Sequence, residues 1–562
     1  MDFKKEIIKL LKKEIKEINP DLIEIPPNPK MGDYAMPCFT FAKAFKKAPN
    51  QIAQDLAKKI KPNTNIKQIK ANGPYLNFFV NKTKLSEKVL KQIFKEKDKY
   101  GSQKKQNKTV VIEFFSPNTN KPLHLGHLRN MALGESMARI IAFQGFDVKR
   151  LNLNNDRGIH ICKSMLAYQK WGKNKEPNKK SDHFVGDYYI KFAQEVKKNK
   201  ALEDKAREML RQWESKDPAT IKLWKKMNKW AFDGFNQTYK RFGIKFNNQY
   251  YESKTYSKGR EIIKDNVKKG LFKKDKTGAT LIDLGPKLGE KILLRSDGTS
   301  VYITQDLYLA VLKHKEYKFD KSIYIVGNEQ NYHFQVLFKL LDILKYKFAK
   351  DCYHLSYGMI FLPEGKMKSR EGTVVDADNI MDDLSNLAKK EIKKRQDFPD
   401  KKVDMLAEKI GLAALKYFLL KFSAHKDFTF NPKESISFEG DTGPYLQYSL
   451  VRAKKIRAKI KTKPTDKVDF SLINKPEEIQ LINHFSILSK VISKASTSYS
   501  PHIITEYAYR LASLFNKFYE SCSVTKTEDK KLQKARMLII EDYTYVMQSC
   551  LTLLGIDSVE QM

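Results

Sequence analysis

The first hundred residues carry apolar side chains at two different spacings. Apolar positions recur every three or four residues until Pro20 ends the pattern, and again after Pro49, which predicts two amphipathic helices. Tyr75–Val80 is typical of a strand, and a closing helix is predicted after it. The helical positions are Phe3, Ile7, Leu10, Leu11 and Ile15, then Ile52, Ala53, Leu56, Ala57 and Ile60, and finally Leu85, Val89, Ile93 and Phe94. We therefore predict a small N-terminal α/β domain at residues 1–105, with a polar linker at 102–108.

Short continuous apolar runs replace this spacing after residue 108. Thr109–Phe114 is rich in β-branched residues, as expected for a strand of a parallel sheet that is covered on both faces. A polar loop follows, and a helical pattern then extends as far as Gly145, so this stretch predicts a βα unit. Similar runs predict further strands of the same sheet at 148–153, 322–326 and 357–362.

Helical patterns interrupt and then follow this α/β region. Residues 155–290 contain helical stretches with aromatic side chains at core-like positions, and the segment is much longer than a normal βα connection. An insertion that splits the sheet is therefore predicted. From about residue 386 the pattern is helical to the end. We predict an α/β domain at 106–385 with an insertion at about 155–290, and an all-α helical bundle at 386–562.

Two histidines stand at the start of the helix that follows Thr109–Phe114. His124 and His127 lie three residues apart and so share one helix face, beside backbone N–H groups that have no intrahelical partner. Such a helix end favours phosphate, and Gly126 would let a nucleotide approach the backbone. A metal-binding pair and ordinary surface histidines remain open as alternatives.

Composition narrows the class of protein without deciding it. The chain has 562 residues, enough for several domains, and a formal net charge of +40, which suits a partner that is a large polyanion such as RNA. A general compositional bias toward lysine would also explain that charge. The five cysteines form no C-x-x-C pair, and no apolar run is long enough to span a bilayer. We expect a cytoplasmic protein with reduced thiols and no membrane partner.

The segment E-F-F-S-P-N-T-N-K-P-L-H-L-G-H-L-R, at 113–129, resembles the H-I-G-H signature of class I aminoacyl-tRNA synthetases in its arginyl-tRNA synthetase form. The loop K-M-K-S-R, at 366–370, resembles the K-M-S-K-S signature of the same family, although Ser369 replaces the second lysine. The resemblance implies a Rossmann-type class I catalytic domain that binds ATP. Whether Lys121 supplies the charge missing at Ser369 stays open.

Family positions for ATP and arginine are implied by the same resemblance. The implied catalytic residues are His124, His127, Lys121 and Lys366, and the implied ATP-binding residues are His124, Gly126, His127, Lys366 and Lys368. The implied arginine-binding residues are Glu113, Asn118, Tyr302, Asp306 and Gln330. A carboxylate offers a guanidinium two coplanar oxygens, so Asp306 suits this role. By residue type alone, Asp306 is also a common helix-start residue. We treat His333 as a pocket-lining candidate.

Both ends of the chain resemble tRNA-binding parts of the family. P-K-M-G-D-Y-A, at 29–35, resembles the appended domain that contacts the tRNA elbow. G-D-T-G-P-Y-L-Q-Y-S-L-V-R-A-K-K, at 440–455, resembles the start of the anticodon-binding bundle. Its candidate base contacts are Tyr445, Gln447, Tyr448 and Arg452, which offer stacking and hydrogen bonding. Core packing of these side chains beside a basic face is the alternative.

The resemblance therefore implies an arginine–tRNA ligase, which converts ATP and L-arginine to arginyl-adenylate and passes the arginyl group to tRNA(Arg). Mg²⁺ is expected with ATP, no structural metal is expected, and a monomer is expected. Other class I synthetases, nucleotidyltransferases of the same superfold and a non-catalytic RNA-binding relative remain alternatives. The intact H-L-G-H favours catalysis, and the long helical C-terminal region favours a tRNA substrate.

Overall fold

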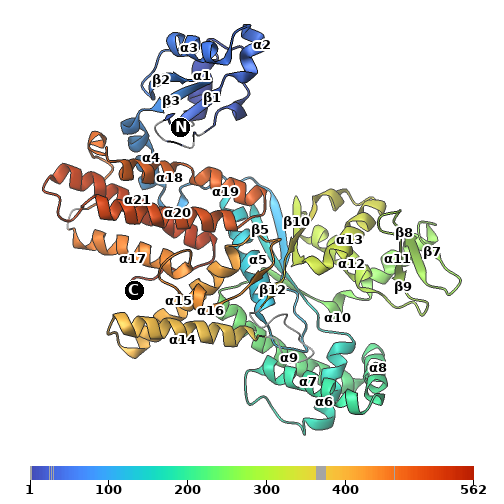
Figure 1. Ribbon diagram of the computed structural model, residues 1–562. Coiled ribbons are helices and arrows are strands. Elements are labelled where there is room, and N and C mark those ends of the chain that lie inside the picture. The colour runs from blue at the N-terminus through green and yellow to red at the C-terminus, as the bar shows by residue number, and fades with distance from the viewer. Residues whose placement is uncertain (1–2, 25, 27, 29–30, 362–374, 461–462) are drawn as a thin grey trace. The chain divides into compact units, whose positions relative to one another are not determined.

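A computed structural model describes residues 3–24, 26, 28, 31–361, 375–460 and 463–562 (Figure 1). The chain forms two compact units, and both are assembled from segments that are distant in the sequence. Unit 1 comprises Met1–Tyr100, Arg452–Leu488 and Leu511–Met547, and unit 2 comprises Gly101–Val451, Ser489–Arg510 and Gln548–Met562.

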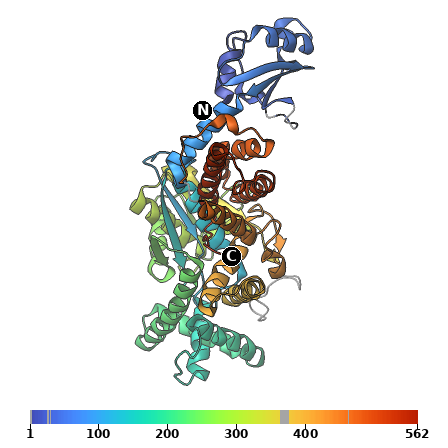
Figure 2. The same cartoon turned by 90° about the vertical axis from the view of Figure 1, so that its left-hand side faces the viewer.

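Unit 1 contains the N-terminal α/β fold that the spacing of apolar residues predicts. Three antiparallel strands lie in the order β1 (Tyr34–Pro37), β3 (Tyr75–Val80) and β2 (Ile66–Asn72) (Figures 1 and 2). The helices of this region are α1 (Phe3–Leu11), α2 (Ala42–Phe45), α3 (Pro49–Lys59) and α4 (Lys82–Glu96). The predicted apolar faces of α1, α3 and α4 are buried.

Unit 2 is built on a five-stranded parallel sheet. Its strand order is β11 (Cys352–Tyr357), β10 (Lys321–Gly327), β4 (Thr109–Phe114), β5 (Asp147–Asn154) and β6 (Asn248–Tyr251). After β4 the chain builds β5 and β6 on one side and β10 and β11 on the other. The strand order therefore reverses between β4 and β10, and parallel sheets bind ligands at the carboxyl ends of strands beside such a point.

The helix after β4 is α5 (Leu125–Phe143), and Gly145 ends it as predicted. Gly145 has a φ of +88°, and a Cβ atom on it would lie 2.1 Å from the carbonyl oxygen of Lys104. The predicted linker runs close against Gly145 here, and its Gln106 N–H donates to the Gly145 carbonyl at 2.9 Å. Glycine is therefore needed here for both its conformation and its small size.

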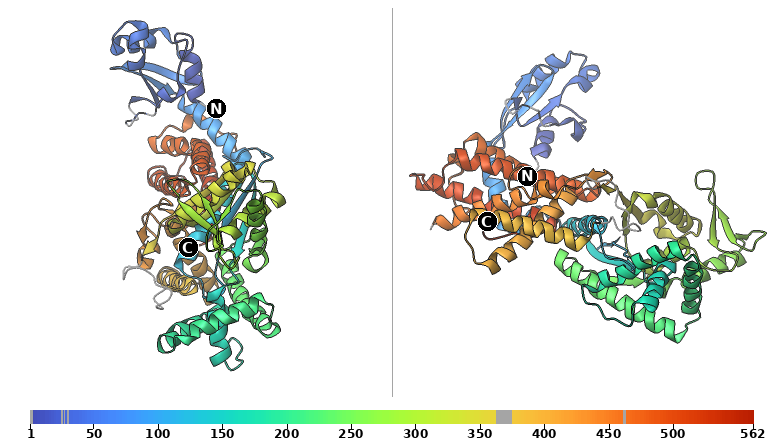
Figure 3. Two further views of the ribbon diagram at one scale, coloured as in Figure 1. Left: turned by 90° about the vertical axis from the view of Figure 1, so that its right-hand side faces the viewer. Right: turned by 60° about the horizontal axis from the view of Figure 1, so that its bottom comes forward.

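Four helices form the body of the predicted insertion: α6 (Ile159–Trp171), α7 (Ser181–Lys198), α8 (Ala201–Glu214) and α9 (Pro218–Phe242) (Figure 3). They share a core that includes Tyr168, Phe184 and Trp230. The chain then returns to the sheet as β6, a strand that sequence patterns did not predict. Its residues, N-Q-Y-Y, contain no aliphatic run that would mark a buried strand.

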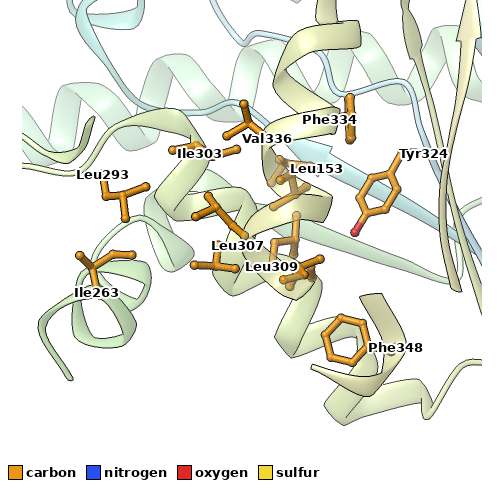
Figure 4. Packing of buried hydrophobic residues seen from close by; sticks show 14 of the residues in the cluster. Leu153, Ile263, Leu293, Ile303, Leu307, Leu309, Tyr324, Phe334, Val336 and Phe348 are labelled. Carbon is orange, nitrogen blue, oxygen red and sulfur yellow. The ribbon is translucent and has the colours of Figure 1, made fainter. Parts of the chain in front are cut away.

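The chain from 252 to 351 packs against the same sheet. Its elements are α10 (Glu252–Thr255), α11 (Lys258–Lys268), β7 (Lys273–Lys274), β8 (Thr280–Asp283), β9 (Glu290–Leu294), α12 (Tyr302–Tyr317), α13 (Asn331–Ile343) and η6 (Lys347–Asp351). Figure 4 shows Ile303, Leu307 and Leu309 of α12 within the shared core. This packing fixes α12 beside the carboxyl ends of the strands.

The strand predicted at 357–362 is wrong in its position and in the sheet it joins. The strand of the main sheet, β11, ends at Tyr357, and β12 (Ile360–Phe361) pairs instead with β13 (Phe428–Thr429). The chain turns away at Gly358, where a Cβ atom would lie 2.4 Å from Asp427 Oδ1. That same carboxylate accepts a hydrogen bond from the Met359 N–H at 2.6 Å, so the turn is held from outside the sheet.

The remaining described chain is helical apart from β13, as predicted. The elements are α14 (Ala377–Arg395), α15 (Asp400–Leu420), α16 (Pro432–Ser435), α17 (Gly443–Lys459), α18 (Pro476–Ser486), α19 (Leu488–Thr497), α20 (His502–Ser521) and α21 (Lys530–Leu553). Within the described ranges, no helix combines the length and the apolar character that a membrane crossing requires.

Candidate active site

A cavity of about 680 Å³ lies at the carboxyl ends of β4 and β10. Two groups of side chains line it, which we call the histidine group (His124 and His127) and the carboxylate group (Glu113, Glu252 and Asp306). The volume lies within the roughly 300–1,000 Å³ that is usual for small-molecule sites.

The histidine group is locked by backbone hydrogen bonds at the start of α5. His124 is the N-terminal cap, and its Nδ1 accepts a hydrogen bond from the Gly126 N–H at 3.2 Å. The His124 N–H in turn donates to Nδ1 of His127 at 3.0 Å. The two rings lie 3.8 Å apart between centroids. Glycine suits position 126, because a Cβ atom there would lie 3.1 Å from the His124 ring and would press on it.

These bonds determine which ring nitrogen carries the proton. A neutral imidazole whose Nδ1 accepts a hydrogen bond has its proton on Nε2. Burial lowers the pKa of His124 to about 3, and burial together with the neighbouring His124 lowers the pKa of His127 well below its ordinary value. At neutral pH both rings are therefore uncharged and each has an Nε2–H group to donate.

The backbone of the helix start is less open to phosphate than expected. The Gly126 and His124 N–H groups are bonded to the imidazoles, and the Leu125 N–H donates to the Val375 carbonyl at 3.2 Å. Gly126 itself lines the cavity beside the His124 ring. The expected contact between phosphate and these backbone N–H groups is therefore not supported, because all three groups already have hydrogen-bond partners.

A strained turn between β4 and α5 supports His127. Phe115 and Ser116 have φ values of +91° and +49°, which side chains other than glycine rarely adopt. The Phe115 N–H donates to Asn130 Oδ1 at 2.7 Å, and the Ser116 N–H donates to Asn152 Oδ1 at 3.1 Å. The Phe115 ring then lies 5.4 Å from the His127 ring, so the turn supplies one wall for it.

Within the carboxylate group, Glu113 is neutralised inside the protein. Its Oε2 accepts a hydrogen bond from Lys313 Nζ at 2.8 Å, and both side chains are buried. The ammonium also lies 3.8 Å from the centre of the Tyr324 ring. Glu113 lines the cavity, where its carboxylate is already paired with Lys313 before any cationic substrate binds.

Asp306 lies in the second turn of α12, and the cap of that helix is Val301. The alternative of a helix-start residue is therefore wrong. Its carboxylate is instead 2.6 Å from His333 Nε2, and both residues line the cavity. Tyr302, one turn earlier, also lines the cavity with 72% of its surface exposed.

Glu252, at the start of α10, was missed by sequence reasoning. It is buried, it lines the cavity, and its nearest ion-pair partner, Arg157, is 3.9 Å away. Burial raises its pKa to about 7; the charge of Arg157 opposes this effect, and the charges of Asp156 and Asp306 add to it. No sequence signal marked it, because it follows the unpredicted strand β6.

Three further sequence candidates are placed by the structure. Asn118 and Gln330 are exposed and line the cavity. Lys121 is absent from the lining, but its charge contributes to the lowered pKa values of both histidines. Lys366, Lys368 and Ser369 lie outside the described residues.

The candidate base-contacting residues divide into two kinds. Tyr445, Tyr448 and Arg452 are half-buried. Gln447 is fully buried, and its Nε2 donates to the Asp557 carbonyl at 2.7 Å, so it holds the polypeptide rather than facing a base. Gln447 is therefore removed from the candidate set.

One group of described residues has the composition of a metal site, namely Asp182, His183 and Asp378. Lys180 Nζ lies 2.9 Å from Asp182 and 2.8 Å from Asp378. An ammonium group already balances these carboxylates, and we assign no metal to them.

Comparison with known families decides among the alternatives left by the fold. Residues 89–432 match the family model described as "tRNA synthetases class I (R), catalytic domain". Residues 2–80 match "Arginyl tRNA synthetase N terminal domain", and residues 446–562 match "DALR anticodon binding domain". The chain belongs to the arginyl-tRNA synthetase family. The predicted family, enzyme class and fold class are thereby confirmed.

Relatives of this synthetase match along nearly its whole length. The arginine–tRNA ligase of Treponema denticola is 47% identical over 559 residues, covering 96% of this chain and 94% of the relative. That of Borrelia turicatae is 40% identical, covering 100% and 99%.

Solved structures show the same fold. The Thermus thermophilus arginyl-tRNA synthetase superposes with a TM-score of 0.85 at 24% identity, covering 100% of this chain and 99% of that one. A Mycobacterium tuberculosis methionyl-tRNA synthetase reaches 0.51 at 12% identity, covering 80% of this synthetase and 91% of that chain. The fold alone therefore does not select the amino acid, whereas the family models do.

Proposed function

We propose that the chain joins L-arginine to tRNA(Arg) in two steps within this cavity. In the first step, a carboxylate oxygen of arginine attacks the α-phosphorus of ATP and pyrophosphate leaves. In the second, a hydroxyl of the terminal ribose of tRNA attacks the arginyl carbonyl and AMP leaves. The observation that carries this proposal is that neutral N–H donors and carboxylates line one cavity at the reversal point of the sheet.

The proposed role of the histidine group is to stabilise charge on the phosphates. Two Nε2–H donors, already oriented by the backbone, can bond oxygens whose charge grows as pyrophosphate departs. Because both rings are neutral, they act as hydrogen-bond donors and add no positive charge. Lys121, Lys366 and Lys368 are proposed to supply the cationic part of the ATP site.

The proposed guanidinium site consists of Asp306 and Glu252. A guanidinium ion presents coplanar N–H groups that suit two carboxylates. The ion pair of Glu252 with Arg157 is long, at 3.9 Å, so its carboxylate can still take a guanidinium. Glu113, Asn118, Tyr302 and Gln330 complete the proposed arginine-binding set. Glu113 contributes the oxygen that does not bind Lys313.

Mg²⁺ is proposed to enter as the counter-ion of the ATP triphosphate. The histidine group offers imidazole N–H donors rather than the oxygen ligands that Mg²⁺ prefers, so phosphate oxygens and water would hold the ion. No step of the reaction is assigned to protein ligands of this ion.

The proposed tRNA-binding parts are residues 1–105, the insertion at 155–290 for the acceptor end, and 386–562 for the anticodon. Tyr445, Tyr448 and Arg452 remain the proposed base contacts, by stacking and hydrogen bonding. A monomer is proposed as the oligomeric state.

The test is pyrophosphate exchange with each amino acid in turn, with and without tRNA(Arg), followed by charging of the tRNA. We expect exchange with arginine alone, because a planar guanidinium can bond two carboxylates at once, whereas lysine offers a single ammonium group. We also expect exchange only when tRNA is present, since Ser369 leaves the second signature one lysine short. Exchange with another amino acid would contradict the arginine site, and exchange without tRNA would contradict only the coupling.

A further inference from the structure

A fully buried arginine lies two residues beyond His127 on α5. The guanidinium of Arg129 donates through NH1 to the carbonyls of Gly358 and Met359. Through NH2 it donates to the carbonyls of Ala424 and Lys426, each at 2.9 Å. One planar group therefore binds two separate chain segments at once.

This buried charge has no ion-pair partner among the described residues. Burial lowers the pKa of Arg129 to about 10, and the charges of Tyr357 and Asp427 offset part of that effect, so Arg129 remains protonated at neutral pH. The Phe428 ring, 4.6 Å away, and the four carbonyl dipoles are its compensation. An apolar side chain would avoid the desolvation cost, so the value of the arginine lies in the geometry of its fork.

The segment that Arg129 holds is a wall of the active-site cavity. Residues 357–361 line that cavity together with His124, His127 and Arg129 itself. The other bound segment, 424–430, braces this wall, since the Phe428 and Phe430 N–H groups donate to the carbonyls of Met359 and Phe361. Arg129 therefore joins the helix of the histidines, the wall and the brace.

The chain is tied to the same helix again at Val375. The Leu125 N–H donates to the Val375 carbonyl at 3.2 Å, and the Ala377 N–H donates to the Leu123 carbonyl at 3.0 Å. Backbone bonds suffice there, whereas a guanidinium makes the connection at Gly358 and Met359. Both attachments lie within the first turns of α5 and its entry.

We propose that Arg129 is a positioning residue, which sets the 357–361 wall at a fixed place relative to His124 and His127 so that bound ATP meets both. The inference rests on the proposed function of the cavity. It predicts a selective loss: ATP use should suffer when the fork is removed, and arginine binding should not, because Glu252, Asp306 and Arg129 share no hydrogen bond.

The decisive variants are Arg129→Lys and Arg129→Gln, with Arg139→Lys as the matched control. Arg139 is on the same helix, pairs with Glu135 at 2.7 Å, and donates to the Thr552 carbonyl outside the cavity. A lysine at 129 keeps the charge but has one ammonium group on a flexible stem, so it cannot hold both segments in one plane. A displacement of about 1 Å can cost on the order of 100-fold in rate.

The measurement is tRNA-supported pyrophosphate exchange, with kcat and KM determined separately for ATP and arginine, and thermal unfolding of each variant. For Arg129→Lys we expect kcat to fall by about tenfold or more and the KM for ATP to rise. The KM for arginine should stay within about twofold of the parent value, and Arg139→Lys should match the parent. Equal ATP kinetics in Arg129→Lys and Arg139→Lys would overturn the proposal, as would equal changes in both KM values.

A second variant, at the outer side of the 357–361 wall, tests the proposal even if the Arg129 variants misfold. Asp427 is exposed, and its carboxylate holds the Met359 N–H, so Asp427→Ala loosens the same wall with little risk to the core. It should raise the KM for ATP selectively but less strongly, and an unchanged KM would overturn the proposal if neither Arg129 variant folds. If the parent itself fails to charge tRNA with arginine, the proposed function fails; if the parent charges and the variants match it, only the role of Arg129 fails.

Discussion

The histidine group and the carboxylate group respond to the same physical force in opposite ways. Burial penalises the charged form of each side chain, so it lowers the pKa of His124 and His127 and raises the pKa of Glu252. The histidines are neutral donors at physiological pH, whereas Glu252, with a pKa of about 7, can gain or lose a proton there. The chemistry of the histidine group suits phosphate oxygens, and that of the carboxylate group suits a cation.

The two groups also differ in how they are assembled. His124 and His127 orient each other through bonds within four residues of chain, so the arrangement is local. Glu113, Glu252 and Asp306 come from β4, α10 and α12, and they meet at one cavity only because these elements pack together. A local arrangement is readable from sequence, and an assembled one requires the fold.

The largest effect is expected from the histidine group. His124→Ala or His127→Ala should lower the rate of adenylate formation by about 100-fold or more, because each removes an oriented donor to the phosphates. The KM for arginine should hardly change. The rates are measured by tRNA-supported pyrophosphate exchange.

Two further substitutions separate the two nitrogens of one ring. His127→Asn retains an acceptor near Nδ1 but loses the outward donor, whereas His127→Gln can still reach the position of Nε2. We expect the glutamine variant to be the more active. The reverse order would mean that the ring acts by capping the helix rather than by donating to ATP.

The same contrast explains what the sequence could predict. The continuous apolar run of Thr109–Phe114 and the spacing of His124 and His127 are local, and both are found where the pattern placed them. The five-stranded sheet, however, includes β6, whose polar and aromatic residues carry no strand signal, and Glu252 follows it. Residues whose role depends on an unrecognised element cannot be found by pattern alone.

Tertiary contacts account for the other places where the structure differs from the sequence prediction. Gln447 has the chemistry of a base contact, but its place opposite the Asp557 carbonyl buries it. The strand predicted at 357–362 continues the apolar pattern, but Gly358 and Asp427 turn the chain into a second, two-stranded sheet. In each case the deciding partner is distant in sequence.

An intermediate effect is expected from the carboxylate group. Asp306→Asn and Glu252→Gln should each raise the KM for arginine by about 10-fold to 100-fold, since a hydrogen bond to a charged group contributes roughly 1.5–3 kcal/mol. The KM for ATP should remain near the parent value, which would give the opposite selectivity to the histidine variants. Equal changes in both KM values would assign these carboxylates a structural role.

The smallest and most specific effect is expected when the pH is varied, because Glu252 titrates near neutral pH and the two histidines do not. With its pKa raised to about 7, Glu252 is mostly protonated below that pH, and arginine must displace the proton to form an ion pair. The KM for arginine should therefore fall by about tenfold between about pH 6 and pH 8 and level off above, as the ionised fraction rises. The KM for ATP should not follow this titration, because His124 and His127 stay neutral over the whole range. Glu252→Gln removes the titrating group and should flatten the arginine profile at a high KM. A profile that keeps its slope in this variant would assign the titration to another group.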